Sequence, residues 1–196
     1  MSFAQVLSIP VSRPIFSREV ANRTYSASAY YLATSIAAII TFSLYPVIVT
    51  ATGFFFFGIQ PTSFGSFCEW LLILLACAYA GSFWGLMFGA FNQNETAAVQ
   101  LNLLFNIVFS FGSGIYANTG SSASLPVKLI SYLSPMRYSS ELLLRRLLGN
   151  WVGKETVLEM LGFTWGDSTC TLLLFGFIFT CFFTGWVSMF FKYRHF

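Results

Sequence analysis

Long uncharged runs, separated by short polar segments, form the main pattern of this chain. No charged residue occurs between Arg23 and Glu69, and none occurs between Glu95 and Lys128. A membrane-spanning helix needs about 20 apolar residues, because each residue rises about 1.5 Å and the hydrocarbon core is about 30 Å thick. We therefore predict an all-α, polytopic membrane protein with four transmembrane helices, over residues 27–59, 70–91, 97–116 and 170–191.

The first 24 residues differ from these runs because they are amphipathic and carry several charges. We predict a helix from about Pro14 to Asn22 that lies along the membrane face. Four spans place both termini on one side of the membrane, and Arg and Lys residues concentrate on the cytosolic side. The charges that flank the termini predict that this side is the cytosol; they are Arg13, Arg18, Arg23, Lys192 and Arg194.

Two short helical segments follow the third predicted span. The first is Leu125–Leu133 and the second is 136–148, with Pro126 and Pro135 near their first helical positions. Ser124 and Ser134 are candidate N-caps, and Gly149 with Asn150 forms a stop signal. Neither segment is long enough to cross a bilayer, so we predict a re-entrant helical hairpin over residues 125–149, followed by a polar stretch over 151–169.

Three glycines recur at intervals of four residues in the second predicted span. Gly81, Gly85 and Gly89 lie on one helix face, and small residues there allow another helix to approach closely. Glycine is also common in membrane helices in general. We favour close helix packing on this face.

Charged and polar residues also recur every four positions farther along the chain. Arg137, Glu141 and Arg145 predict an ion-pair ladder on one face of the hairpin, which either holds the hairpin in place or contacts substrate. A similar row in the third predicted span supports two alternatives, hydrogen bonds between helices or the lining of a pathway. That row consists of Asn102, Asn106 and Ser110.

Composition and single-residue chemistry exclude several classes of function. The chain is 56% hydrophobic and 9% charged, against about 25% charged residues in soluble domains. A net charge of +3 without a basic cluster argues against nucleic acid as a partner. His195 is the only histidine, so we expect neither a metal cluster nor histidine-based catalysis. A disulfide between Cys68 and Cys170 stays open, since sequence cannot fix pairing.

No nucleotide-binding loop is present in the 196 residues. The nearest candidate is GNWVGK over 149–154, where three residues instead of four separate the glycines and Glu155 follows the lysine. We therefore expect the chain to have no ATPase motif and no cofactor of its own.

Several stretches, taken in order, resemble one family of membrane domains. These stretches are RPIFSRE (13–19), FGI (57–59), FGSGIY (111–116) and SPMRYSSE (134–141). They are similar to the membrane domain of ATP-binding-cassette transporters of the G subfamily, the white-pigment and multidrug half-transporter type. The resemblance covers nearly all of the chain and corresponds to the C-terminal part of the family's ABC-2 type transmembrane domain.

The resemblance implies a function and a set of partners. The chain would be a partial ABC-2 exporter-type domain in a plasma or internal membrane, moving a lipid-like or amphipathic substrate. ATP and Mg²⁺ would enter through a separate nucleotide-binding domain, and the pathway would form with a second transmembrane domain, identical or different. The alternative is a truncated membrane scaffold or regulator that does not transport.

The resemblance also implies roles for individual residues. Residues 1–24 would couple to the nucleotide-binding domain through Arg13, Arg18 and Glu19. One face of the 97–116 span would line the substrate path, and the residues that follow would form a gate. The implied path residues are Leu103, Asn106, Ile107 and Ser110, and the implied gate residues are Ile115 and Tyr116.

Overall fold

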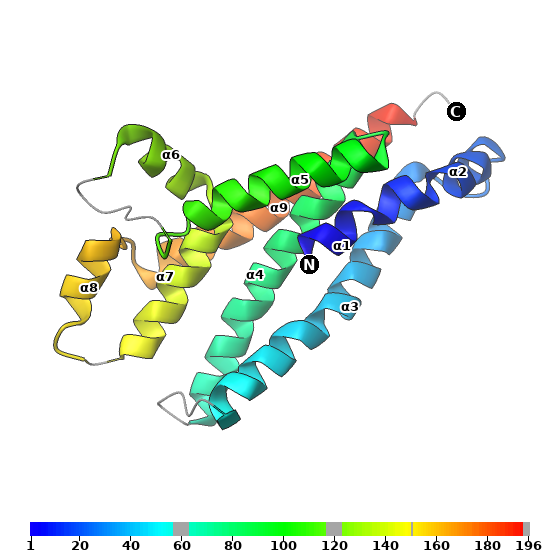
Figure 1. The fold of residues 1–196 in the computed structure, drawn as a ribbon. Coiled ribbons are helices and arrows are strands. Elements are labelled where there is room, and N and C mark those ends of the chain that lie inside the picture. The colour runs from blue at the N-terminus through cyan, green and yellow to red at the C-terminus, as the bar shows by residue number, and fades with distance from the viewer. Residues whose placement is uncertain (57–62, 117–122, 150, 194–196) are drawn as a thin grey trace. The chain divides into compact units, whose positions relative to one another are not determined.

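The computed structural model describes residues 1–56, 63–116, 123–149 and 151–193, and every element in these ranges is an α-helix (Figure 1). The chain divides into two compact units. The first unit comprises Met1–Leu44, Ala78–Leu104 and Phe177–Phe196, and the second comprises Tyr45–Cys77 and Phe105–Gly176. Four long helices contribute residues to both units; they are α3 (Ala27–Phe56), α4 (Phe64–Phe91), α5 (Glu95–Phe111) and α9 (Asp167–Lys192).

Three helices are long and apolar enough to cross a membrane. They are α3, α4 and α9, each with a mean hydropathy of 2.0 over its best window. Helix α3 begins at Ala27 as predicted, whereas α4 begins at Phe64 instead of 70 and α9 at Asp167 instead of 170. The expected end of the first span at 57–59 lies outside the described residues.

Helix α5 is shorter than the predicted span over 97–116. Its 17 residues extend about 25 Å, which is less than the hydrocarbon core of about 30 Å. The helix ends at Phe111, where a Cβ added to Gly112 would lie 3.1 Å from the carbonyl oxygen of Ile130. Gly114 then takes a φ of +84°, a conformation that glycine adopts without strain. A fourth full-length span is therefore not confirmed.

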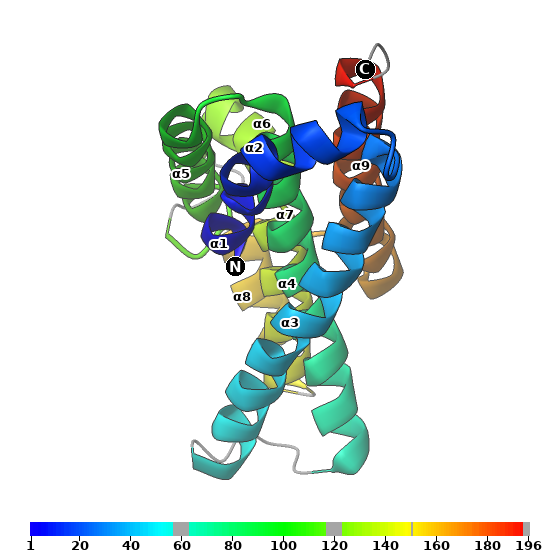
Figure 2. The same cartoon turned by 90° about the vertical axis from the view of Figure 1, so that its right-hand side faces the viewer.

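The N-terminal segment is helical over nearly its whole length. Helices α1 (Ser2–Val6) and α2 (Ser8–Ala21) follow each other with a break at Leu7 (Figure 2). The predicted start at Pro14 is wrong, because Pro14 lies inside α2. Burial explains the difference: Ile9, Phe16 and Val20 of α2 belong to the apolar core of the first unit, and this packing offsets the missing N–H of the proline.

The hairpin follows its predicted boundaries closely. Helix α6 spans Leu125–Leu133 and α7 spans Pro135–Leu148, with Ser134 in extended backbone between them. Neither Ser124 nor Ser134 caps its helix through its side chain; the Ser134 hydroxyl donates instead to the carbonyl of Phe109 at 2.8 Å. Helix α7 ends before Gly149, whose φ is +48°, and Asn150 lies outside the described residues.

One helix was not predicted. Within the stretch expected to be polar and irregular, α8 spans Lys154–Leu161 and ends at Gly162, which takes a left-handed φ of +75°. Leu158 is the one buried residue of α8. A short helix with a single buried apolar position leaves little periodicity in the sequence, which is why the pattern did not reveal it.

Candidate functional site

Arg13 of the implied coupling segment points toward the C-terminal end of α4. Its Nη2 donates to the carbonyl oxygens of Gly89, at 3.3 Å, and Asn92, at 2.8 Å. Lys192 donates to the carbonyls of Ala90 and Phe91 at the same helix end, at 3.4 and 3.3 Å. Cations are favourable there, since the last carbonyls of a helix have no intrahelical partner and carry partial negative charge. Arg13 thus serves the internal packing of the first unit.

Arg18, the second implied coupling residue, lies on the exposed face of α2 beside two apolar residues. Val11, Ile15 and Arg18 follow an i, i+4, i+7 spacing, and Val11 and Ile15 expose 57% and 66% of their surface. Sequence reasoning missed the two apolar residues, although their spacing with Arg18 was a visible signal.

Glu19, next to Arg18, is held by the loop that follows α2. The Tyr25 hydroxyl donates to Glu19 Oε2, and this hydrogen bond raises the pKa of Tyr25 to about 12. Burial and the charge of Glu19 act in the same direction. The contact fixes the last turn of α2 against the start of α3.

The implied path residues all lie on α5, and their environments differ by chemistry. Leu103 and Ile107 are exposed, which suits a surface that contacts substrate or another protein. Asn106 and Ser110 are half-buried, and the Ser110 hydroxyl donates to the Asn106 carbonyl at 2.8 Å. Asn102 differs from both, because it is buried and its Oδ1 accepts a hydrogen bond from Ser2 of α1 at 2.6 Å. For Asn102 the structure favours the interhelical hydrogen bond over the pathway.

The implied gate residues follow the glycine turn at the end of α5. Ile115 and Tyr116 are both exposed, and the backbone N–H of Ile115 donates to the hydroxyl of Ser113. Their side chains are therefore accessible to a ligand or to a neighbouring chain.

The predicted ion-pair ladder is only half correct. Glu141 is fully buried, with an exposed fraction of 0%, and its Oε1 accepts from Arg145 Nη2 at 2.8 Å. The same oxygen accepts the backbone N–H of Trp165, also at 2.8 Å. Glutamate four residues before arginine is the favourable order on a helix, so this pair follows the predicted spacing.

Arg137 does not pair with Glu141. Its guanidinium donates to the Ser131 hydroxyl and to the Gly162 carbonyl, each at 2.6 Å, and lies over the ring of Tyr132 at 4.8 Å. Side chains on a helix lean toward its N-terminus, so Arg137 reaches the end of α6 while Glu141 lies one turn behind it. Arg137 therefore joins α6, α7 and the turn after α8.

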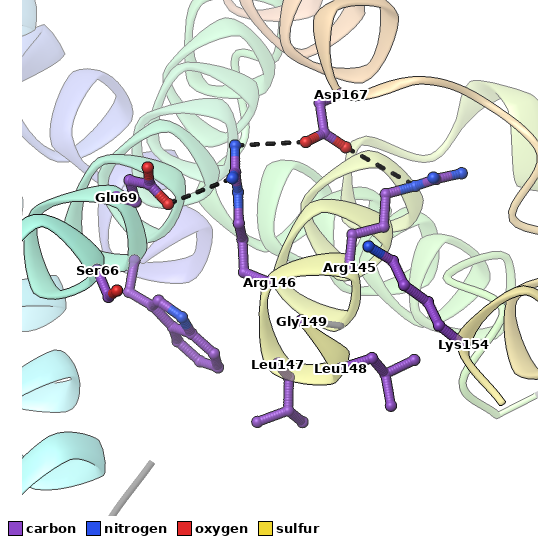
Figure 3. Close-up of a pocket in the computed structure, with 10 residues that line it drawn as sticks. Ser66, Glu69, Arg145, Arg146, Leu147, Leu148, Gly149, Lys154 and Asp167 are labelled. Carbon is purple, nitrogen blue, oxygen red and sulfur yellow. Dashed lines mark ion pairs between the residues drawn. The ribbon is translucent and has the colours of Figure 1, made fainter. Parts of the chain in front are cut away.

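A charged pocket of about 620 Å³ lies in the second unit, beside the Glu141–Arg145 pair (Figure 3). Arg146 of α7 pairs with Glu69 of α4 at 3.4 Å and with Asp167 of α9 at 3.3 Å. Arg145 approaches Asp167 at 3.9 Å, and Lys154 lines the same pocket. Sequence reasoning missed Glu69, Arg146 and Asp167 as a group, because no sequence pattern links three helices so far apart along the chain.

The remaining candidate chemistry is structural. Cys68 and Cys170 are free thiols, as are Cys77 and Cys181, so the disulfide alternative is not adopted. Among the described residues, no group of three or more His, Cys, Asp or Glu side chains is arranged to hold a metal ion.

Comparison with known proteins identifies the family. Residues 1–148 match the family model described as ABC-2 type transporter. The chain belongs to the ABC-2 type transporter family. It is therefore an integral, multi-pass membrane protein and forms part of the membrane portion of a transporter.

Curated relatives agree with this assignment. The chain is 29% identical to protein white of Ceratitis capitata over 173 residues, and this region covers 87% of the chain and 23% of the relative. It is 28% identical to protein white of Drosophila melanogaster over 86% of the chain and 23% of that protein. It is also 28% identical to protein brown of Drosophila virilis over 73% of the chain. The chain thus spans less than a quarter of the length of these relatives.

Proposed function

We propose that this chain is the membrane-spanning part of an ATP-driven transporter of the G-subfamily type, moving a lipid-like or amphipathic substrate. The family match over residues 1–148 is the observation that carries this proposal. ATP and Mg²⁺ would be held by a nucleotide-binding domain. The 196-residue sequence itself contains no match to the phosphate-binding loop motif. A second transmembrane domain, identical or different, would complete the pathway.

The proposed topology has four crossings, by α3, α4, α5 and α9. Residues 1–24 would then lie in the cytosol, and the hairpin over 125–149 would re-enter from the outer side. Helices α6 and α7 have 9 and 14 residues, or about 14 and 21 Å, so neither reaches across the hydrocarbon core. Irregular backbone such as the Ser134 turn is stable at membrane depth only inside protein or beside water.

The coupling role belongs, in this proposal, to the exposed face of α2. Arg18 presents a charge and Val11 and Ile15 present apolar surface, a combination that suits a protein interface with an apolar centre and a polar rim. Arg13 would support α2 from the inside through its contacts at the end of α4. Movement of a nucleotide-binding domain against this face would tilt α2 and, through it, α4.

The substrate path would run along α5. Leu103 and Ile107 supply exposed apolar surface, while Asn106 and Ser110 supply polar groups at the edge of the same face. This combination suits an amphipathic substrate, because apolar walls with few polar groups are typical of small-molecule sites. Ile115 and Tyr116 would close the outer end of the path.

The proposal is tested in the assembled transporter by the double charge reversal Arg18→Glu with Glu19→Arg. We expect substrate transport to fall at least about tenfold while membrane insertion and ATP hydrolysis persist, because the stroke no longer reaches the membrane part. Arg23→Glu, in the exposed loop after α2, is the matched control and should transport normally. Unaltered transport in the double variant would remove this face from coupling, and an assembled complex that neither hydrolyses ATP nor transports would favour the scaffold alternative.

A further inference from the structure

A charged pocket and an apolar pocket in the second unit have three lining residues in common. The charged pocket described above has a volume of about 620 Å³, and a largely apolar one of about 670 Å³ adjoins it. Glu69, Arg146 and Asp167 line both. Both volumes fall within the range of about 300–1,000 Å³ that is typical of ligand sites. A molecule that filled both pockets would need a polar end and an apolar end.

The apolar pocket is formed by α4, α7 and α9 and is open on one side. Its walls include Leu72 and Ala76 of α4, Leu142 of α7, and Leu172 and Phe175 of α9. Leu142 and Ala76 are buried, whereas Leu72, Leu172 and Phe175 are exposed. Since α4 and α9 are apolar enough to span a membrane, the open side would face hydrocarbon chains.

Two cations and two carboxylates line the charged pocket when the Arg145–Glu141 pair is set aside. Arg145 is already paired with the buried Glu141, which leaves Arg146 and Lys154 as cations and Glu69 and Asp167 as carboxylates. Arg146, Glu69 and Asp167 each keep 42–51% of their side-chain surface exposed. No ion pair involves Lys154 among the described parts of the chain, and Figure 3 shows its amine on the same side of the pocket as Asp167 and Arg145.

We propose that this site binds a zwitterionic glycerophospholipid, with its head group in the charged pocket and an acyl chain in the apolar one. Lysine and arginine bind phosphate oxygens through charge-assisted hydrogen bonds, and Lys154 and Arg146 would hold the phosphate. Glu69 and Asp167 would face the ammonium group. Trp70, which lines the charged pocket, would contact the same cation through its aromatic face.

The equal numbers of cations and carboxylates favour a zwitterionic phospholipid over an anionic lipid or a lipid without a phosphate. An anionic lipid would bring its charge against Glu69 and Asp167 without a compensating ammonium group. A lipid without a phosphate would leave Lys154 without a counter-ion, since Arg146 already pairs with Glu69 and Asp167. The proposal does not rest on the proposed function, because a bound lipid would stabilise the junction of α4, α7 and α9 whether or not the protein transports.

The test uses the purified chain in nanodiscs, with a photoactivatable phosphatidylcholine whose reactive group lies on the acyl chain. We expect cross-links to concentrate on 72–76 and 171–175, with competition by unlabelled phosphatidylcholine. Diacylglycerol and inorganic phosphate, each lacking one half of the ligand, should compete at least about tenfold less well. Equal competition by diacylglycerol, or competition by phosphate alone, would overturn the proposal.

Variants separate the two halves of the site. Lys154→Gln and Arg146→Gln should each lower the affinity for phosphatidylcholine by about tenfold, while Lys128→Gln on α6, outside both pockets, should leave it unchanged. Thr171→Trp should block the apolar pocket without changing any charge, whereas Thr180→Trp, exposed on the same helix, serves as its control. A thermal unfolding midpoint within a few degrees of the parent chain confirms that each variant folds. Cross-linking that spreads evenly over the exposed spans, or that is equal in all variants, would refute the site.

Discussion

Two arginines on α7 show how the chain accommodates buried charge. Arg145 is neutralised by Glu141 one turn before it, whereas Arg137 finds a hydroxyl, a carbonyl and an aromatic ring instead of a carboxylate. Isolated buried charges are costly, and both solutions supply hydrogen bonds in place of water. The consequence is that each arginine links α7 to a different neighbour: Arg137 to α6, and Arg145 to the segment before α9.

The first prediction concerns Glu141. Replacement by alanine removes the acceptor for Arg145 and for the Trp165 N–H, and leaves both half-buried groups short of a partner. We expect Glu141→Ala to lower the free energy of unfolding by about 3 kcal/mol, at the lower end for a broken buried pair because Asp167 lies near Arg145. Thermal unfolding of the chain in nanodiscs measures the change. Glu159→Ala on the exposed face of α8 should cost less than about 0.5 kcal/mol, and an equally small effect at Glu141 would contradict the prediction.

The second prediction concerns Tyr25 in the loop after α2. Its pKa lies at about 12 instead of 10, chiefly through the hydrogen bond to Glu19. Because the folded-state pKa is raised, the contact contributes its full stability below pH 10 and loses it as the pH rises through 12. Glu19→Gln should return the pKa of Tyr25 toward 10, while Glu95→Gln, at the first residue of α5, should not. An NMR titration of isotope-labelled tyrosine would decide this, and an unchanged midpoint in Glu19→Gln would exclude the contact as the cause.

At the scale of elements, the glycine face of α4 has a clear partner. Gly85 and Gly89 lie against the backbone of α1, where a Cβ added to Gly85 would overlap the Ser2 carbonyl oxygen and one added to Gly89 would lie 2.6 Å from the Val6 carbonyl oxygen. Gly81 has more room, with the nearest atom 3.9 Å away. The prediction of close packing is confirmed for Gly85 and Gly89 but not for Gly81, and the partner, α1, was not foreseen.

The third prediction follows from this difference between the glycines. Gly85→Ala should lower the free energy of unfolding by about 1–3 kcal/mol, because the Ser2 backbone must move to admit a methyl group. Gly81→Ala, one turn away on the same face, should be neutral or stabilising by up to about 1 kcal/mol through better helix propensity. Thermal unfolding of the two variants side by side is the measurement. Equal stability of the two would show that α1 does not rest on this face.

Elements were predictable where local signals mark them. The bounds of α6 and α7 followed from Pro126, Pro135 and Gly149, because these residues act through their own backbone geometry. The start of α2 and the existence of α8 were missed, since tertiary burial of Ile9 and Leu158 decides them. The Glu69–Arg146–Asp167 group was also beyond the sequence, because ion pairs between distant helices depend on how those helices pack.

At the scale of the whole molecule, the number of membrane crossings depends on α5. Helices α3, α4 and α9 have the length and hydropathy to span a bilayer, while the 17 residues of α5 extend about 25 Å. The residues after Phe111 would have to supply the remaining depth, and a glycine-rich turn can do so only inside protein or beside a cavity. Four crossings place the ends of the chain on one side, and three place them on opposite sides.

The last prediction is that α5 crosses, so that the start of α3 and the end of α9 face the same side. The charges Arg13, Arg18 and Lys192 favour the cytosol for that side. A variant lacking the four native cysteines would carry single cysteines in place of Asn22, Asn94, Thr156 or Tyr193, to be labelled with a membrane-impermeant thiol reagent in oriented vesicles. Cysteines at 22, 94 and 193 should react from one side and the cysteine at 156 from the other. If α5 does not cross, the cysteine at 156 would be labelled from the same side as those at 22 and 94, and the cysteine at 193 from the opposite side. This pattern would exclude the four-span topology. It would leave the family assignment intact, because that assignment depends on residues 1–148 as a whole.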